Sequence, residues 1–105
     1  MEPYEVGLSD EAKRDLERIS SYILNELQAP QAAEDVLADL ENAVASLCFF
    51  PTRIPLARET VWKKRDIHAM VVRKYLLYFR IDEANRQVHV IRIIYGKRDQ
   101  AEQIS

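Results

Sequence analysis

The sequence predicts a single α+β domain with the element order β-α-α-β-β-β, in which an α-helical hairpin packs on one face of a four-stranded antiparallel sheet. Three observations support this prediction. Apolar residues recur at spacings of three and four over residues 10–47, and their period changes to two after residue 66. The chain has 105 residues, enough for one hydrophobic core and too few for two.

The first half of the chain contains a strand followed by two helices. Tyr4, Val6 and Leu8 alternate with other residues and predict a short strand, after which Ser9 offers a helix N-cap. Pro30 suits the first turn of the second helix, and the short connection between the helices predicts an antiparallel hairpin. The apolar faces comprise Ala12, Leu16, Ile19, Ile23 and Leu27, then Ala33, Val36, Leu37, Leu40, Val44 and Leu47.

The second half contains a loop followed by three strands. Residues 50–66 include two prolines and show no clear period, which predicts a loop with at most a short turn or strand. Strands are expected at residues 67–73, 75–81 and 87–95, with a hairpin turn in the sequence DEANR. Both faces of the last strand are apolar, so it should lie inside the sheet, with the first strand as its second neighbour. These faces comprise Val88, Val90 and Ile94, and Ile91, Ile93 and Tyr95.

The charged residues divide unevenly between the two halves. Residues 1–50 carry eleven acids and three bases (−8), and residues 51–105 carry six acids and twelve bases (+6), which gives the net charge of −2. Either the basic half forms a local surface that contacts phosphates or a target protein, or the halves neutralise each other and the bases form a solvated face. The candidate nucleic-acid- or target-binding residues are Lys63, Lys64, Arg65, Arg73, Arg80, Arg92 and Tyr95.

Few residues offer catalytic chemistry. There is no nucleophile motif, no phosphate-binding glycine loop and no metal-ligand spacing, so the sequence predicts no cofactor or metal. Of the two histidines, His89 lies in the middle of a strand and suits a packed or surface role, so His68, at the start of a strand beside the basic loop, is the acid/base candidate. The cations that would support it are Lys97 and Arg98, which follow the last strand. Any enzyme activity would therefore be phosphodiester cleavage supported by cations. A single cysteine, and no apolar run of about 20 residues or N-terminal signal region, predict a cytoplasmic protein without a disulfide.

The order of these elements, together with "LSDEAKRDLERISSYI" and "YLLYFRIDEANRQVHVIRIIYGKRD", resembles the RelE/ParE superfamily of bacterial toxins from type II toxin–antitoxin modules, which include plasmid-stabilization systems. The resemblance covers residues 1–105 as one toxin domain. It implies a toxin that arrests growth and is neutralised by a cognate antitoxin, whose C-terminal segment wraps the helices and sheet of the toxin in a hetero-oligomer.

The resemblance implies one of two targets. RelE-like members are ribosome-dependent endoribonucleases that cut mRNA, whereas ParE-like members inhibit DNA gyrase and lack the catalytic residues. Lys97 and Arg98 match the basic residues after the last strand, but Tyr75 stands where the nuclease has an arginine. The nuclease lysines of the second strand fall near Asp66 and His68. This pattern favours a ParE-like gyrase inhibitor. The alternatives are an mRNA interferase that uses Arg98, Lys97 and His68, and a non-toxic binding module that keeps the fold.

Overall fold

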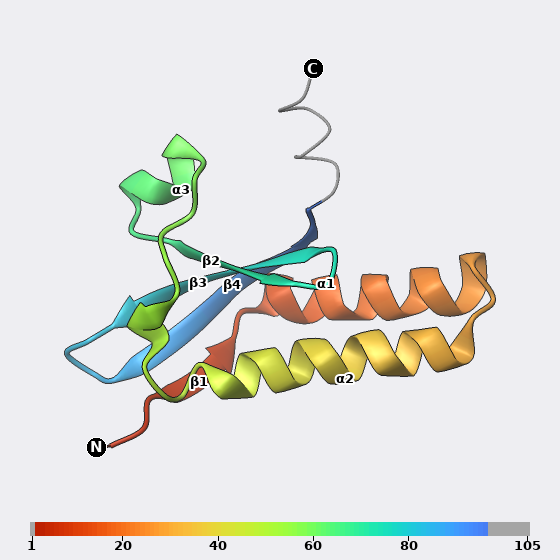
Figure 1. Cartoon of the computed structure of the whole chain (residues 1–105), viewed down its shortest axis with the longest axis horizontal. Coiled ribbons are helices and arrows are strands. Elements are labelled where there is room, and N and C mark those ends of the chain that lie inside the picture. The colour runs from red at the N-terminus through yellow and green to blue at the C-terminus, as the bar shows by residue number, and fades with distance from the viewer. Residues whose placement is uncertain (1, 97–105) are drawn as a thin grey trace.

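The chain folds around a four-stranded sheet with the strand order β1-β4-β3-β2, and helices lie on both of its faces (Figure 1). The structure is a computed structural model and describes residues 2–96. The elements are β1 (Glu5–Leu8), α1 (Asp10–Ser21), a π-helical segment (Tyr22–Glu26), α2 (Pro30–Ser46), a 3₁₀ turn (Pro51–Arg53), α3 (Thr60–Lys64), β2 (His68–Val72), β3 (Tyr75–Asp82) and β4 (Gln87–Tyr95).

The sheet is mixed, which corrects the predicted antiparallel sheet. β4 lies between β3 and β1, as predicted, but β1 runs parallel to β4, with Val6 opposite Val88 and Leu8 opposite Val90. Apolar periodicity shows which faces of a strand are buried and does not report the direction of its neighbour. A parallel pair also needs a long connection, and here the helical hairpin and two further strands supply it.

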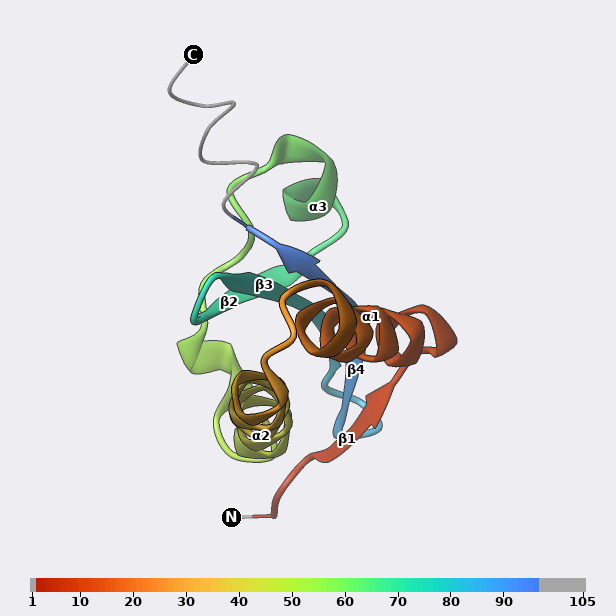
Figure 2. The same cartoon turned by 90° about the vertical axis from the view of Figure 1, so that its right-hand side faces the viewer.

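The helical hairpin confirms the prediction for residues 10–47. α1 and α2 lie side by side and antiparallel beneath the sheet (Figures 1 and 2). The Ser9 hydroxyl oxygen accepts from the backbone N–H of Ala12 at 3.0 Å and donates to the Ile91 carbonyl at 2.8 Å, so the predicted N-cap also ties α1 to β4. The buried core between hairpin and sheet comprises Ala12, Ile23, Ala33, Val36, Leu40, Ala43, Leu47, Leu77, Phe79, Val88, Val90 and Ile93.

The short helix α3 covers part of the opposite sheet face, where a loop was predicted. Its Trp62 ring stacks on Tyr78 of β3 with 4.9 Å between the ring centroids, above a second buried cluster that includes Ile67. A five-residue helix with one inward-facing anchor shows no apolar period, so the sequence pattern missed it. No helix within residues 2–96 is long and apolar enough to cross a membrane.

A β-bulge in β4 changes which residues face the hairpin. Tyr78 pairs with Arg92, whereas Phe79 pairs with Val90, so Ile91 is an extra residue in β4. Past the bulge, the alternation of side chains between the two sheet faces shifts by one residue. The prediction that Ile94 lies on the same face as Val88 is therefore wrong. Val88, Val90 and Ile93 pack against the hairpin, while Ile91 and Ile94 pack on the side of α3.

Candidate protein-binding groove

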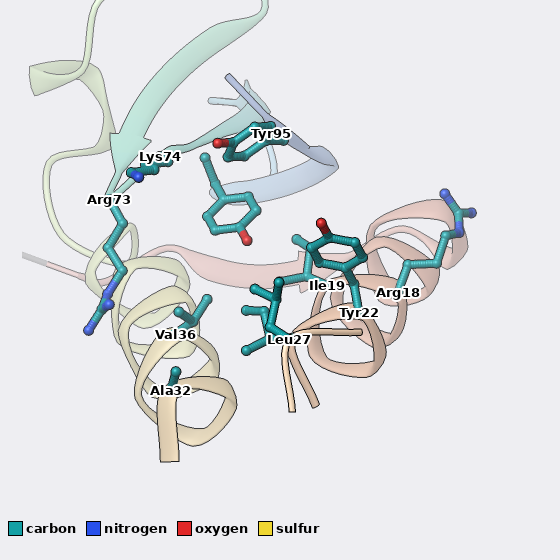
Figure 3. A pocket seen from close by; sticks show the side chains of 11 residues that line it. Arg18, Ile19, Tyr22, Leu27, Ala32, Val36, Arg73, Lys74 and Tyr95 are labelled. Atoms are coloured by element: carbon teal, nitrogen blue, oxygen red, sulfur yellow. The ribbon is translucent and has the colours of Figure 1, made fainter. Parts of the chain in front are cut away.

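A groove of about 700 Å³ lies between the tip of the helical hairpin and the end of the sheet (Figure 3). The two helices form one side, and the β2–β3 turn with the end of β4 forms the other. The lining combines apolar and aromatic side chains with three cations and contains no histidine and no carboxylate. These residues are Arg18, Ile19, Tyr22, Ile23, Leu27, Ala32, Val36, Arg73, Lys74, Tyr75 and Tyr95.

The helical side of the groove depends on the π-helical segment at the end of α1. The backbone N–H of Leu27 bonds to the carbonyl of Tyr22 at 3.3 Å, five residues back, which widens the last turn of the helix. Beyond the sheet edge no other element of residues 2–96 covers the hairpin, and Tyr22 and Leu27 remain 56% and 57% exposed (Figure 1). The groove therefore presents apolar side chains that the rest of residues 2–96 does not cover.

The sheet side of the groove is aromatic. Tyr75 and Tyr95 are opposite each other on β3 and β4, and their rings meet edge to face with 5.7 Å between centroids. Burial raises the pKa of the Tyr75 hydroxyl, and the neighbouring phenols of Tyr95 and Tyr22 raise it further, whereas the positive charge of Arg73 lowers it. The three tyrosines thus line one groove, and their phenols are close enough to interact electrostatically.

The pKa of Tyr75 gives a prediction for the charge of this groove. Replacing Arg73 by glutamine removes the charge that lowers this pKa, so the pKa of Tyr75 should rise further. Lys74→Gln is the matched control and should change it less. NMR titration of ¹³C-labelled tyrosine measures this directly. Because a raised pKa favours the protonated phenol in the folded state, the contribution of Tyr75 to stability is present below about pH 10 and is lost above it. A Tyr75 that titrates below its ordinary pKa would contradict this assignment.

The cations at the groove are only loosely held. Arg73 contacts the carboxylate of Asp39 at 2.5 Å, and Arg18 contacts Asp15 at 3.4 Å, but Arg73, Asp39 and Arg18 are all exposed. Exposed ion pairs contribute about 0–1 kcal/mol, so a bound partner can replace them at little cost. The groove therefore suits a segment with apolar anchors and acidic flanking residues.

A buried carboxylate fixes β4 beside the groove. Asp15 of α1 accepts hydrogen bonds from Nε and Nη2 of Arg92 at 2.8 and 3.1 Å and from the backbone N–H of Ile93 at 2.9 Å. The hydrogen bond to Asp15 is the main reason that the pKa of Arg92 is raised, although partial burial of Arg92 opposes this; Glu11 adds a longer ion pair of 3.6 Å. Arg92 is thus engaged in a structural ion pair.

The other predicted residues fall into distinct environments. Of the predicted binding residues, Arg73 and Tyr95 line the groove, whereas the exposed side chains of Lys63, Lys64 and Arg65 belong to the end of α3 and the turn after it, and that of Arg80 to β3. His68 lies on β2 with Nδ1 2.7 Å from the Ile54 carbonyl oxygen and its ring stacked on Phe79, 5.1 Å between centroids. Lys97 and Arg98 lie outside the described residues. Among residues 2–96, no three histidine, cysteine or carboxylate side chains are placed to hold a metal ion.

Sequence reasoning did not identify Asp15 and Tyr22 as functional. A detectable signal was present for Asp15, because a carboxylate stands one residue before Leu16 on the apolar face of a predicted helix, between Ala12 and Ile19. Such a position predicts a buried acid with a cationic partner. No comparable signal marks Tyr22, because its exposure depends on where the hairpin extends beyond the sheet.

Comparisons with known proteins agree with this fold. The family model "ParE toxin of type II toxin–antitoxin system, parDE" matches residues 6–100. The chromosomal ParDE toxin–antitoxin system from P. aeruginosa is similar with a TM-score of 0.72 and 16% identity, over 88% of this chain and 95% of that chain. The toxin–antitoxin complex RelBE2 from Mycobacterium tuberculosis is similar with a TM-score of 0.64 and 22% identity, over 89% of this chain and 98% of that chain. A double mutant of the E. coli toxin RelE in the free state is similar with a TM-score of 0.63 and 15% identity, over 96% of this chain and 92% of that chain. No curated protein matches the sequence.

Proposed function

The chain belongs to the ParE toxin family of type II toxin–antitoxin systems, and from this membership we propose that it arrests growth by inhibiting DNA gyrase and is neutralised by a cognate antitoxin. It is the toxin component of such a module; the target and the partner are the proposed part. Because gyrase acts on chromosomal DNA, the toxin would work in the cytoplasm.

The observation that carries this proposal is the composition of the groove. Its lining offers a large apolar surface with exposed Tyr22 and Leu27 and no histidine or carboxylate to transfer a proton. His68, the acid/base candidate, lies outside the groove lining and packs on Phe79. A surface of this kind binds a protein segment through apolar anchors, which favours an inhibitor that acts by binding over a nuclease.

The antitoxin is proposed from the neighbours and from the chemistry of the groove. The similar structures from P. aeruginosa and M. tuberculosis are of toxin–antitoxin systems. A cognate antitoxin segment would place apolar side chains against Ile19, Leu27 and Val36 and acidic side chains near the cations Arg73 and Lys74. Toxin and antitoxin would then form a hetero-oligomer in which the exposed apolar surface is covered.

Induction in a bacterial host without the antitoxin tests the proposed target. We expect growth arrest in which a DNA-damage reporter rises before the rate of protein synthesis falls, because inhibited gyrase leaves broken or overwound DNA. Co-expression of the protein encoded by the adjacent gene should restore growth. An early stop of protein synthesis with mRNA cut at the ribosomal A site would instead support the RelE-like nuclease, and unimpaired growth would support a non-toxic binding module.

A further inference from the structure

A second candidate surface lies on the sheet face opposite the hairpin. Three consecutive basic residues, Lys63, Lys64 and Arg65, form the end of α3 and its C-cap, and all three are exposed. α3 stands on the far side of the sheet from α1 and α2 (Figures 1 and 2). We call these three residues the α3 basic cluster.

The α3 basic cluster rests on a well-anchored support. Trp62 stacks on Tyr78 with an angle of 23° between the ring planes, and the hydroxyl of Tyr78 donates to Glu59 at 3.4 Å. After the helix, the backbone N–H of Ile67 bonds to the Trp62 carbonyl at 3.0 Å, and Ile67 is fully buried. A charged surface on a fixed support loses little conformational entropy when it binds a ligand.

The positive charge of this cluster is not neutralised within the described chain. Among residues 2–96, neither Lys63 nor Lys64 has an ion pair, and Arg65 lies over the Trp62 ring at 5.7 Å. Arg18, Arg73 and Arg92, in contrast, all contact carboxylates on the hairpin. Arg80 is exposed on β3 two residues after Tyr78, so strand alternation places it on the same sheet face as α3.

We infer that the α3 basic cluster, together with Arg80, binds the phosphodiester backbone of double-stranded DNA. Unpaired lysine and arginine side chains gain affinity for DNA by releasing the cations condensed on its phosphates. Lysine is depleted in protein–protein interfaces, so consecutive lysines on an exposed helix favour a polyanion over a protein partner. The site lies on the face opposite the groove, and DNA and an antitoxin can therefore be bound together. This inference stands independently of the proposed gyrase inhibition.

DNA binding by the full-length toxin tests this inference, measured as the fluorescence anisotropy of a labelled DNA duplex between about 20 and 200 mM salt. We expect binding that weakens as salt rises. The variant K63Q/K64Q/R65Q should reduce the slope of log K against log salt by about three, about one for each cation removed. The matched control K13Q/R14Q/R53Q removes the same charge from exposed residues of α1 and the 3₁₀ turn, outside the groove lining, and should change the slope by less than about one.

Three results would overturn the inference. Equal effects of the two triple variants would show that overall charge, and not the α3 basic cluster, determines binding. If the unaltered toxin does not bind the duplex even at about 20 mM salt, the α3 basic cluster is not a DNA-binding site. Tighter binding to an RNA duplex of the same sequence would overturn the assignment to DNA. Thermal unfolding of each variant verifies that the fold is retained, since all six substituted side chains are exposed.

Discussion

Replacing Asp15 by alanine is expected to lower the free energy of unfolding by about 3–5 kcal/mol, the cost of leaving a partly buried charge without its partner. The side chain of Asp15 is 4% exposed and accepts two hydrogen bonds from the Arg92 guanidinium, one from the backbone N–H of Ile93 and a longer one of 3.4 Å from Arg18. Urea unfolding followed by circular dichroism measures this change as a shift of the midpoint at constant slope.

The size of this effect follows from the role of Asp15 at the sheet edge. β1 ends at Leu8, opposite Val90, whereas β4 continues to Tyr95, so no strand of residues 2–96 pairs with this edge of β4 beyond Val90. The carboxylate of Asp15 takes the place of that strand as acceptor for the N–H of Ile93. Alanine would leave this N–H without an acceptor and the guanidinium with only the longer contact to Glu11.

Asp39→Ala is the matched control for Asp15→Ala. Asp39 also pairs with an arginine, Arg73, but both side chains are nearly half exposed, so the loss should stay within about 1 kcal/mol. Asp15→Asn keeps an acceptor oxygen, so its loss of unfolding free energy should lie between those of Asp15→Ala and Asp39→Ala. If Asp15→Ala cost no more than Asp39→Ala, the buried ion pair would not hold β4 to α1.

Replacing Leu27 by glutamate is expected to weaken binding of the cognate antitoxin by about 100-fold or more. Leu27 is 57% exposed in the toxin alone, so the substitution leaves the fold intact. In the complex it would place a carboxylate on the apolar floor of the groove, at a cost of about 3 kcal/mol, and against acidic residues of the partner. Titration calorimetry with the purified protein encoded by the adjacent gene measures the change in affinity.

Val71→Glu provides the control for Leu27→Glu. Val71 is 69% exposed and pairs with Leu76 on the sheet face that carries α3, so this variant adds the same charge at an exposed apolar residue away from the groove. It should bind the antitoxin within about threefold of the unaltered toxin, as expected for surface changes outside an interface. Equal loss in both variants, or unchanged binding of Leu27→Glu, would place the antitoxin elsewhere.

Local patterns in the sequence predict the elements of this fold but not their spatial relations. Features that depend on neighbouring residues were predicted correctly. These are the helical period of residues 10–47, the Ser9 N-cap and the position of β4 inside the sheet. The direction of β1 is set by its pairing with β4, about 80 residues away, and the bulge at Ile91 is set by the register between β3 and β4; neither is visible in the pattern of a single strand. α3 was not predicted because a single tryptophan anchors it to the sheet, and its five residues show no apolar period.

The predicted basic residues show the same distinction between composition and placement. The sequence identified an excess of positive charge in the second half, but the structure separates it into different environments. Arg92 is committed to Asp15, Arg73 borders the groove beside Asp39, and the α3 basic cluster lies on the opposite face. Because the acid partners come from the first half of the chain, only the folded structure could assign them.

Gyrase inhibition is tested by the supercoiling activity of purified DNA gyrase in the presence of the full-length, antitoxin-free toxin. We expect supercoiling of relaxed plasmid to fall as toxin is added, and prior addition of the antitoxin to restore it. Normal supercoiling at saturating toxin, with toxin-dependent cleavage of mRNA on programmed ribosomes, would contradict it.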